Sequence, residues 1–287
     1  MGDGPDVGIV IATRDRREGL LVTLGRLGCG RPVVVVDNGS RDGTSAAVRA
    51  AFPAVTVLEP GENLGAAART VGAQALGTPV VAFCDDDSWW APGALELAAG
   101  VFAGHPRLGL LAARVLVGDD EHLDPTCAVM AASPLAADRL PGPGVLGFVA
   151  CGAVVRREAF LAVGGFDGRY GIGGEERLLA LDLATAGWDL AYVAAVVAHH
   201  HPGRCGPRPG RVRRQLRNDL WSAWLRRPAR SALRETARLV ADAALRHPVT
   251  AAGGVAAGLR GARWVARERA VVSPAVERAL RSIDAVG

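Results

Sequence analysis

The feature that most constrains this chain is the alternation of short β-branched runs with helix-spaced segments in its first hundred residues. Each run is rich in valine or isoleucine and ends in polar residues, which is typical of a strand buried on both faces of a parallel sheet. We therefore predict a right-handed βαβ winding and an α/β fold. The expected strands cover 7–12, 33–36, 55–59 and 80–84, and the expected helices cover 15–27, 44–52 and 66–76.

Beyond residue 100 the alternation loosens, but further elements can be predicted. We expect strands over 108–117, 149–155 and 190–198, helices over 157–163 and 175–186, and an irregular segment over 118–147. From residue 211 onward the pattern predicts helices broken at Pro228, Pro248 and Pro274. We therefore divide the chain into a domain spanning 1–203 and a basic helical extension spanning 204–287.

Polar side chains follow each of the first four predicted strands. In an open α/β sheet, ligands bind beyond the carboxyl ends of the strands, and the topology brings these ends to one edge. The Asp37-Asn38-Gly39 segment by itself is more typical of a turn, so the prediction rests on the set as a whole. Its members are Thr13, Arg14, Asp15, Asp37, Asn38, Asn63, Arg69, Asp85, Asp86 and Asp87.

The run of aspartates at 85–87 is the most informative member of this set. Adjacent carboxylates repel one another, so water, helix N-termini or a divalent cation must offset their charge. Hard oxygen ligands suit Mg²⁺ or Mn²⁺, and either ion binds a diphosphate well. We predict a site for Mn²⁺ or Mg²⁺, with a solvated acidic loop as the alternative. Trp89 and Trp90 follow, either to stack on a sugar or to pack beneath this loop.

The basic residues exclude several mechanisms and are unevenly distributed. All 33 are arginines, so no chemistry that needs a lysine, such as a Schiff base or a P-loop, is available. Residues 1–203 carry 15 Arg against 23 acidic residues, whereas 204–287 carry 18 Arg against 6. A basic extension of this kind indicates an anionic neighbour, such as phospholipid or a polyprenyl phosphate, or else a solvated helical surface.

Arginine and tryptophan alternate at helical spacing where this extension begins. Such a pattern suits the headgroup region of an anionic membrane, and packing of the tryptophans onto the preceding domain is the alternative. The residues are Arg204, Arg208, Arg211, Arg213, Arg214, Arg217, Trp221 and Trp224.

The cysteines and the N-terminus bear on the compartment. The 5 cysteines are an odd number without a CxxC pair, so we expect reduced buried thiols. The first fifteen residues lack the basic and apolar segments of a signal peptide. We expect a cytoplasmic protein, with peripheral attachment to the inner face of the membrane as a further hypothesis.

Several of these blocks together resemble family 2 glycosyltransferases of the GT-A fold, whose mostly parallel sheet is Rossmann-like. The resemblance covers roughly residues 7–202, and the blocks occur in the family's order. They are VIATRDR at 10–16, VVVDNGSRDGT at 34–44, ENLGAAAR at 62–69, FCDDD at 83–87, GGFDGRY at 164–170 and GEE at 174–176.

The resemblance implies a nucleotide diphosphate sugar bound at the strand ends. Thr13 and Arg14 match the segment beside the base and ribose, and Asp37 matches the carboxylate that hydrogen-bonds the base. Asn63 and Arg69 match the block that lines the nucleotide pocket. In the DxD-type motif Asp87 is the expected metal ligand, with Asp85 or Asp86 near the ribose and Asp85 as a second ligand. The metal would stabilise the departing diphosphate.

The resemblance also implies a general base and a histidine. Glu176 stands where the family usually has the basic Asp, and Glu175 remains an alternative. Direct displacement at the anomeric carbon then implies inversion. A histidine follows the last strand near the diphosphate or the metal; alignment by Tyr192 favours His199 and leaves His201 open. Asp182 stands where the family often has Arg, which is a second departure.

Other functions fit less well. A non-catalytic GT-A-like binding protein is the main alternative, although the carboxylates of both a metal site and a base are present. A nucleotidyltransferase needs a lysine and a Gly-rich loop, and a dehydrogenase needs GxGxxG after the first strand. Nucleic-acid binding would rest on the arginines of the extension alone. We favour UDP or dTDP sugars over GDP sugars, and a lipid-linked, cell-wall or natural-product acceptor.

Overall fold

The computed structural model describes residues 6–28, 30–203, 210–246 and 248–286. Its described part contains a 9-stranded sheet in the order β3-β2-β1-β4-β8-β6-β9-β5, with β7 paired to β6. The first four strands are parallel, as predicted, whereas β8 lies antiparallel between β4 and β6. The strands are β1 (Val7–Thr13), β2 (Val33–Asp37), β3 (Thr56–Leu58), β4 (Val80–Asp85), β5 (Ser88–Trp90), β6 (Leu108–Val117), β7 (His122–Leu123), β8 (Ala153–Arg156) and β9 (Asp189–His200).

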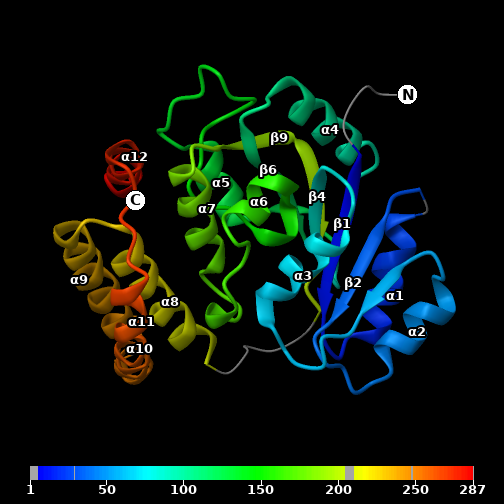
Figure 1. Ribbon diagram of the computed structural model, residues 1–287, viewed down its shortest axis with the longest axis horizontal. Helices are drawn as coiled ribbons and strands as arrows, with labels where there is room; N and C mark the ends of the chain where they lie inside the picture. Colours follow the sequence, from blue (N-terminus) through cyan, green and yellow to red (C-terminus); the bar gives the residue numbers. More distant parts are fainter. Residues whose placement is uncertain (1–5, 29, 204–209, 247, 287) are drawn as a thin grey trace.

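Helices cover both faces of this sheet (Figure 1). Because successive side chains of a strand point to opposite faces, Ile9 and Ile11 of β1 enter one core while Val10 enters the other. The helices around the sheet are α1 (Arg17–Leu27), α2 (Thr44–Ala51), α3 (Ala68–Ala75), α4 (Ala94–Gly104), α5 (Pro125–Ala131), α6 (Arg157–Ala162) and α7 (Glu175–Thr185). The predicted α/β architecture is therefore confirmed.

The C-terminal helices form a group of their own beside α7, on the left of Figure 1. Two of the three predicted prolines stand first in a helix, where the missing N–H costs nothing, and Pro228 separates the first two helices. The group consists of α8 (Arg211–Arg226), α9 (Ala229–Arg246), α10 (Pro248–Arg260), α11 (Ala262–Arg267) and α12 (Pro274–Asp284). None of the described helices is both long enough and apolar enough to cross a membrane.

The tryptophans of α8 do not form the exposed pair that a membrane-facing α8 would present. Trp221 is 8% exposed and packs edge-on against Tyr170 and Trp264. Trp224 is 37% exposed and donates its indole N–H to Thr236. Trp221 thus follows the alternative of packing onto the preceding domain. Arg204 and Arg208 lie outside the described residues.

The described cysteines agree with the expectation of reduced thiols. Cys84, Cys127 and Cys151 are buried and free of disulfides. Cys29 and Cys205 lie outside the described residues.

Candidate active site

The acidic run after β4 lies against the loop that follows β1. The Thr13 hydroxyl donates to Asp86 Oδ2 at 2.9 Å. Arg16 donates to Asp87 Oδ2 at 2.9 Å and to Asp86 Oδ1 at 3.3 Å. Burial and the neighbouring carboxylates raise the pKa of Asp86 to about 6, despite the hydrogen bond from Thr13. The structure thus brings the ends of β1 and β4 together, and Arg16 is a contact that the sequence analysis missed.

The three histidines at the end of β9 alternate between the two faces of the strand. His200 faces the acidic run, with its Nε2 3.4 Å from Asp87 Oδ1, whereas His199 and His201 contact the Trp89 ring. Burial alone would raise the pKa of Asp87, but the hydrogen bond and charge of His200 lower it. Asp87 in turn raises the pKa of His200. The histidine beside the carboxylates is therefore His200, which the sequence analysis did not select.

The residues around Asp85 fit a divalent cation. Asp85, Cys151 and His200 have ligating atoms within 4.8 Å of one another. Burial raises the pKa of the Cys151 thiol well above its usual range, so the thiol stays protonated and is a poor ligand. Asp85 and His200 remain from this group, and the Asp87 carboxylate adjoins it through its 3.4 Å contact with His200. This donor set suits Mn²⁺ or Mg²⁺.

Arg69 connects this carboxylate cluster to the predicted base. It lies on α3, is 7% exposed and forms an ion pair with Asp85. The positive charge of Arg69 also attracts the carboxylates of Glu175 and Glu176 at the start of α7. Burial and repulsion from Glu175 raise the pKa of Glu176 to about 8. Burial raises the pKa of Glu175 as well. Glu175 and Glu176 therefore lie within the electrostatic reach of both Arg69 and Asp85.

The loop before α7 is fixed from the other side by α8. The Asn218 amide donates to the carbonyls of Tyr170 at 3.0 Å and Gly173 at 2.5 Å. Arg217 donates to the Tyr170 carbonyl at 2.8 Å. Gly174 has a φ of +86°, and a Cβ there would lie 2.9 Å from the side chain of Gln215, so only glycine fits. Contacts from the C-terminal helices thus set where the first turn of α7 begins.

The remaining predicted nucleotide-binding residues surround the end of β2. Asp37 is 3% exposed and accepts hydrogen bonds from the Ser45 hydroxyl at 2.6 Å and the Ser40 N–H at 2.8 Å. Asn63 accepts from the Gly65 N–H at 3.0 Å, which stabilises the turn before α3. Arg14 is 46% exposed and lies beside Asp15. Asp37 and Asn63 are thus held by local donors, whereas Arg14 points toward solvent.

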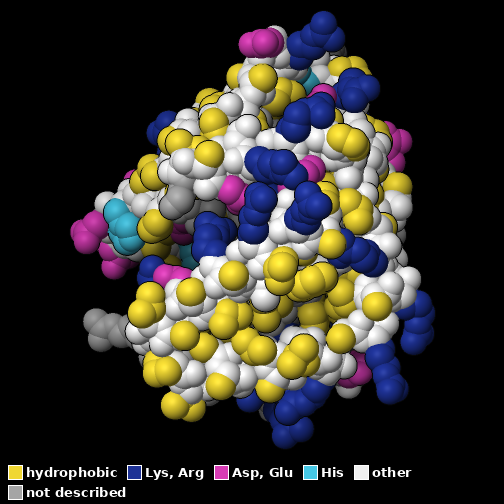
Figure 2. All heavy atoms as spheres, turned by 90° about the vertical axis from the view of Figure 1, so that its left-hand side faces the viewer, with side chains coloured by type: hydrophobic (Ala, Val, Ile, Leu, Met, Phe, Trp, Pro, Cys, Tyr) yellow, Lys and Arg dark blue, Asp and Glu magenta, His cyan; other side chains and the backbone are white. Residues whose placement is uncertain are grey.

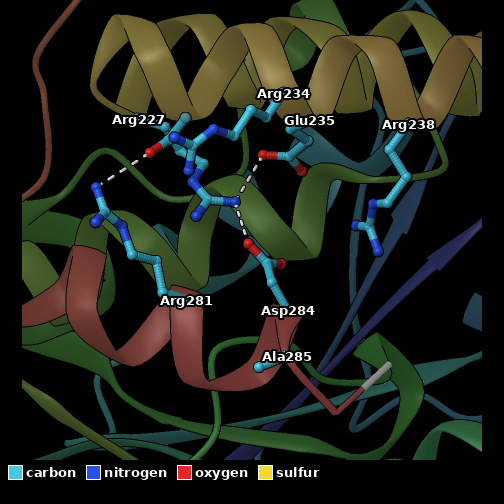
Figure 3. Close-up of a pocket in the computed structure, with 8 residues that line it drawn as sticks. Arg227, Arg234, Glu235, Arg238, Arg281, Asp284 and Ala285 are labelled. Carbon is cyan, nitrogen blue, oxygen red and sulfur yellow. Dashed lines mark hydrogen bonds and ion pairs between the residues drawn. The ribbon is translucent and has the colours of Figure 1, made fainter.

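A separate hollow of about 380 Å³ lies between α9 and α12, away from the strand ends (Figure 3). Arg227 reaches Glu235 at 3.0 Å and Asp284 at 2.6 Å, so carboxylates neutralise its charge. The other lining residues are Ser231, Arg234, Arg238, Arg281 and Ala285. We interpret this hollow as part of a structural ion-pair network that connects α9 and α12.

Comparisons with known proteins identify the family of the chain. The sequence profile described as Glycosyl transferase family 2 matches residues 9–164. Two relatives from Mycobacterium tuberculosis strains, each an N-acetylglucosaminyl-diphospho-decaprenol L-rhamnosyltransferase, are 30% identical over 275 residues and cover 80% of this chain and 89% of their own.

Solved structures of low sequence identity share the fold. A mannosyltransferase from Pyrobaculum calidifontis in complex with GDP-Man and Mn²⁺ has a TM-score of 0.59 at 22% identity, covering 99% of this chain and 80% of its own. A fragment of S. aureus TarS in complex with UDP has a TM-score of 0.59 at 14% identity, covering 83% and 72%. The expected GT-A fold is therefore confirmed. By its match to the sequence profile and to the Mycobacterium tuberculosis relatives, the chain belongs to glycosyl transferase family 2.

Proposed function

We propose that this protein is an inverting glycosyltransferase that moves a sugar from a nucleotide diphosphate sugar to a hydroxyl of a lipid-diphosphate-linked acceptor. The observation that carries the proposal is the continuity of the charged groups. Asp87 and His200 contact each other, and Arg69 connects Asp85 to Glu175 and Glu176. This continuity supports a cation site and a proton-accepting carboxyl group that serve one reaction.

The residues at the strand ends would bind the donor. Asp87 and Asp85, joined by His200, would hold Mn²⁺ or Mg²⁺. When bound, the ion supplies Lewis-acid stabilisation of the departing diphosphate. The nucleotide would lie along the ends of the parallel strands, with contacts from Thr13, Arg14, Asp37, Asn63, Arg69 and Asp86.

Glu176 acts as the general base in this mechanism. Its carboxylate takes the proton of the acceptor hydroxyl, and the oxygen attacks the anomeric carbon from the side opposite the diphosphate. The new C–O bond forms while the bond to the diphosphate oxygen breaks, and the nucleoside diphosphate leaves. Configuration at the anomeric carbon is therefore inverted.

The donor and acceptor classes are supported by different observations. A buried carboxylate at Asp37 suits the imide N–H of uracil or thymine, which favours UDP or dTDP sugars over GDP sugars. The curated relatives are named as rhamnosyltransferases acting on an N-acetylglucosaminyl-diphospho-decaprenol, which supports a deoxyhexose and a lipid diphosphate. We also propose a cytoplasmic protein at the inner face of the membrane, where such an acceptor would be reached.

A turnover assay with a donor panel tests this function. UDP, dTDP and GDP sugars are offered with Mn²⁺ and an N-acetylglucosaminyl-diphospho-polyprenol, and the product is detected by mass spectrometry. We expect one donor to give an elongated lipid, and Asp87→Ala to abolish metal-dependent donor binding in calorimetry. Donor binding without turnover for every acceptor would instead support a non-catalytic binding protein.

A further inference from the structure

A second hollow, of about 200 Å³, lies between α8 and α10 and differs in charge from the one between α9 and α12. Among the described residues, its lining contains four arginines and no acidic residue. The residues are Gly210, Arg213, Arg214, Arg217, Ala257 and Arg260. A concave site in which several guanidinium groups converge is suited to a phosphate or diphosphate, which each group can bind through paired N–H donors.

The charge of this hollow is not neutralised within the described part of the chain. No ion pair joins Arg213, Arg214 or Arg260 to a carboxylate among the residues that the structure describes. Burial and the like charges of Arg214 and Arg213 lower the pKa of Arg217. An anion bound among these groups would relieve this repulsion.

The hollow adjoins the loop that leads into the proposed base. Arg217 donates to the carbonyls of Arg169 at 3.1 Å and Tyr170 at 2.8 Å. A Cβ at Gly171 would lie 3.6 Å from Arg214 Cδ, so the arginine stem packs directly on that loop. A ligand held by these arginines is therefore close to the chain that carries Glu175 and Glu176.

An apolar surface continues from the hollow along α10. Val249 and Leu259 are 87% and 69% exposed, and Leu245 at the end of α9 is 87% exposed. Figure 2 shows hydrophobic side chains over the lower part of the face that the C-terminal helices present, with arginines above them. Because Ala257 and Arg260 of the same helix line the hollow, a ligand with an anionic head and an apolar tail matches the surface.

We propose that Arg213, Arg214, Arg217 and Arg260 bind the diphosphate of the lipid-linked acceptor, whose hydrocarbon chain then runs along the exposed face of α10. The proposal rests on the proposed function and extends it to the site that recognises the acceptor. The guanidinium groups hold the diphosphate, and the sugar attached to it extends past the 171–174 loop toward Glu176.

Binding of farnesyl diphosphate and of inorganic pyrophosphate, measured by calorimetry in EDTA, tests the site directly. The variant is Arg213→Gln/Arg260→Gln, in which both side chains are exposed, so folding should be retained. The matched control is Arg263→Gln/Arg278→Gln, which removes the same charge from exposed positions outside the hollow. We expect affinity for both probes to fall at least about tenfold in the variant and to stay unchanged in the control. Equal affinities in both double variants would overturn the proposal.

Two further arms separate this site from the donor site and from the proposed function. Asp87→Asn should keep its affinity for farnesyl diphosphate in EDTA. If this affinity is lost in Asp87→Asn but retained in Arg213→Gln/Arg260→Gln, the probe binds at the donor site and the proposal is overturned. In the transfer assay the arginine variant should raise the KM for the lipid acceptor and leave the KM for the donor unchanged. If the parent protein transfers no sugar but the arginine variant still loses the probe, the anion site stands and the proposed function fails.

Discussion

Glu175 and Glu176 are adjacent in sequence but differ in what surrounds them. Glu175 is 3% exposed, and its carboxylate accepts a hydrogen bond from the Gly173 N–H within its own loop. The Glu176 side chain is partly exposed, and burial together with repulsion from Glu175 raises its pKa to about 8. A general base must be reachable by the acceptor, and a raised pKa makes its carboxylate a stronger proton acceptor once deprotonated. This contrast supports Glu176, which the sequence analysis also preferred.

Replacing Glu176 by Gln should therefore reduce turnover without affecting donor binding. The amide keeps the shape of the side chain but cannot take a proton, so we expect kcat to fall on the order of 10²-fold or more. Single-turnover transfer and calorimetric donor binding measure the two quantities. Glu175→Gln is the matched control, and a large loss of kcat in that variant with little change in Glu176→Gln would assign the base to Glu175.

The raised pKa of Glu176 predicts the pH dependence of the reaction. The base works only when deprotonated, so kcat/KM should increase with pH up to about 8 and then level off. The stability contribution has the opposite sign: the folded state favours the protonated form, so this contribution is lost as pH rises from about 4.5 to about 8. A kcat/KM profile that is flat between pH 6 and about 9 in the parent protein would contradict the assignment.

His200 and His199 offer a paired test at the proposed metal site. Removing His200 takes away a proposed ligand and the imidazole that contacts Asp87, so Mn²⁺ affinity in the presence of nucleotide should fall about 10- to 100-fold in His200→Ala. His199→Ala should leave the affinity nearly unchanged, because that side chain stacks on Trp89. Titration of Mn²⁺ followed by electron paramagnetic resonance measures both. The reverse order of effects would restore His199 as the residue near the metal.

The sequence predicted the residues at the carboxyl ends of the parallel strands, because the fold class alone determines where these ends lie. The same argument could not select His200. The pairing of β9 with β6 is interrupted where Ala113 opposes Val193 but Arg114 opposes Val197. Such an irregularity changes which face each later residue occupies, so counting from Tyr192 does not identify the inward histidine. Arg16 was missed because its contacts depend on the path of the loop after β1.

At the level of elements, α7 is held in place by the helices that follow it. Arg226 of α8 forms an ion pair with Asp182, and Arg177 reaches Glu235 of α9 at 2.5 Å. Asp182 was noted as a departure from the family pattern, in which an arginine is common at that position. Here the arginine stands on α8 instead, so the pair connects the catalytic helix to the extension.

The Arg227 network should make a large contribution to stability. Arg227 is 2% exposed and contacts Glu235, Glu277 and Asp284. Removing it leaves the buried carboxylates of Glu235 and Glu277 with one arginine partner each, Arg177 and Arg281. We expect Arg227→Met to lower the free energy of unfolding by about 3–5 kcal/mol in urea denaturation of the full chain. Arg246→Gln breaks only an exposed pair with Asp242 and should cost less than about 1 kcal/mol. Similar losses in both variants would show that the network is not what holds α12.

The elements that the sequence missed are short or depend on distant partners. The segment 118–147, expected to be irregular, contains β7 and α5, and α5 begins with Pro125 after an Asp124 cap. β5 has only three residues and is a strand because Ser88, Trp89 and Trp90 pair with β9. A long run of β-branched residues can be recognised as a strand from the sequence alone. A strand of three residues cannot, because it forms only where it pairs with a neighbouring strand.

At the scale of the whole molecule, the C-terminal helices hold the catalytic helix in position and also present an exposed basic and apolar surface. They fix the loop before α7 through Asn218, and they expose arginines next to apolar side chains on α9 and α10. We keep the division at residue 203 as a proposal, although contacts with α7 suggest that the two parts depend on each other. The burial of Trp221 moves the apolar part of the proposed membrane contact from α8 to α10.

Membrane attachment is the prediction that belongs to this scale. The parent protein should co-sediment with vesicles that contain anionic lipid and dissociate at high salt, because each basic residue near such a surface contributes roughly 1 kcal/mol. Arg211→Gln/Arg213→Gln/Arg214→Gln should remain in the supernatant, since it loses three charges beside the apolar face of α10. Arg41→Gln/Arg107→Gln/Arg139→Gln removes the same charge from exposed positions of the first domain and should still sediment.

Val249→Ser/Leu259→Ser separates the electrostatic from the apolar contribution to membrane binding, because it keeps every charge and removes exposed apolar area. Weaker sedimentation of this variant than of the parent protein at low salt would show that α10 enters the interface. A parent protein that stays in the supernatant at low salt would rule out the membrane contact and make a soluble acceptor the better hypothesis.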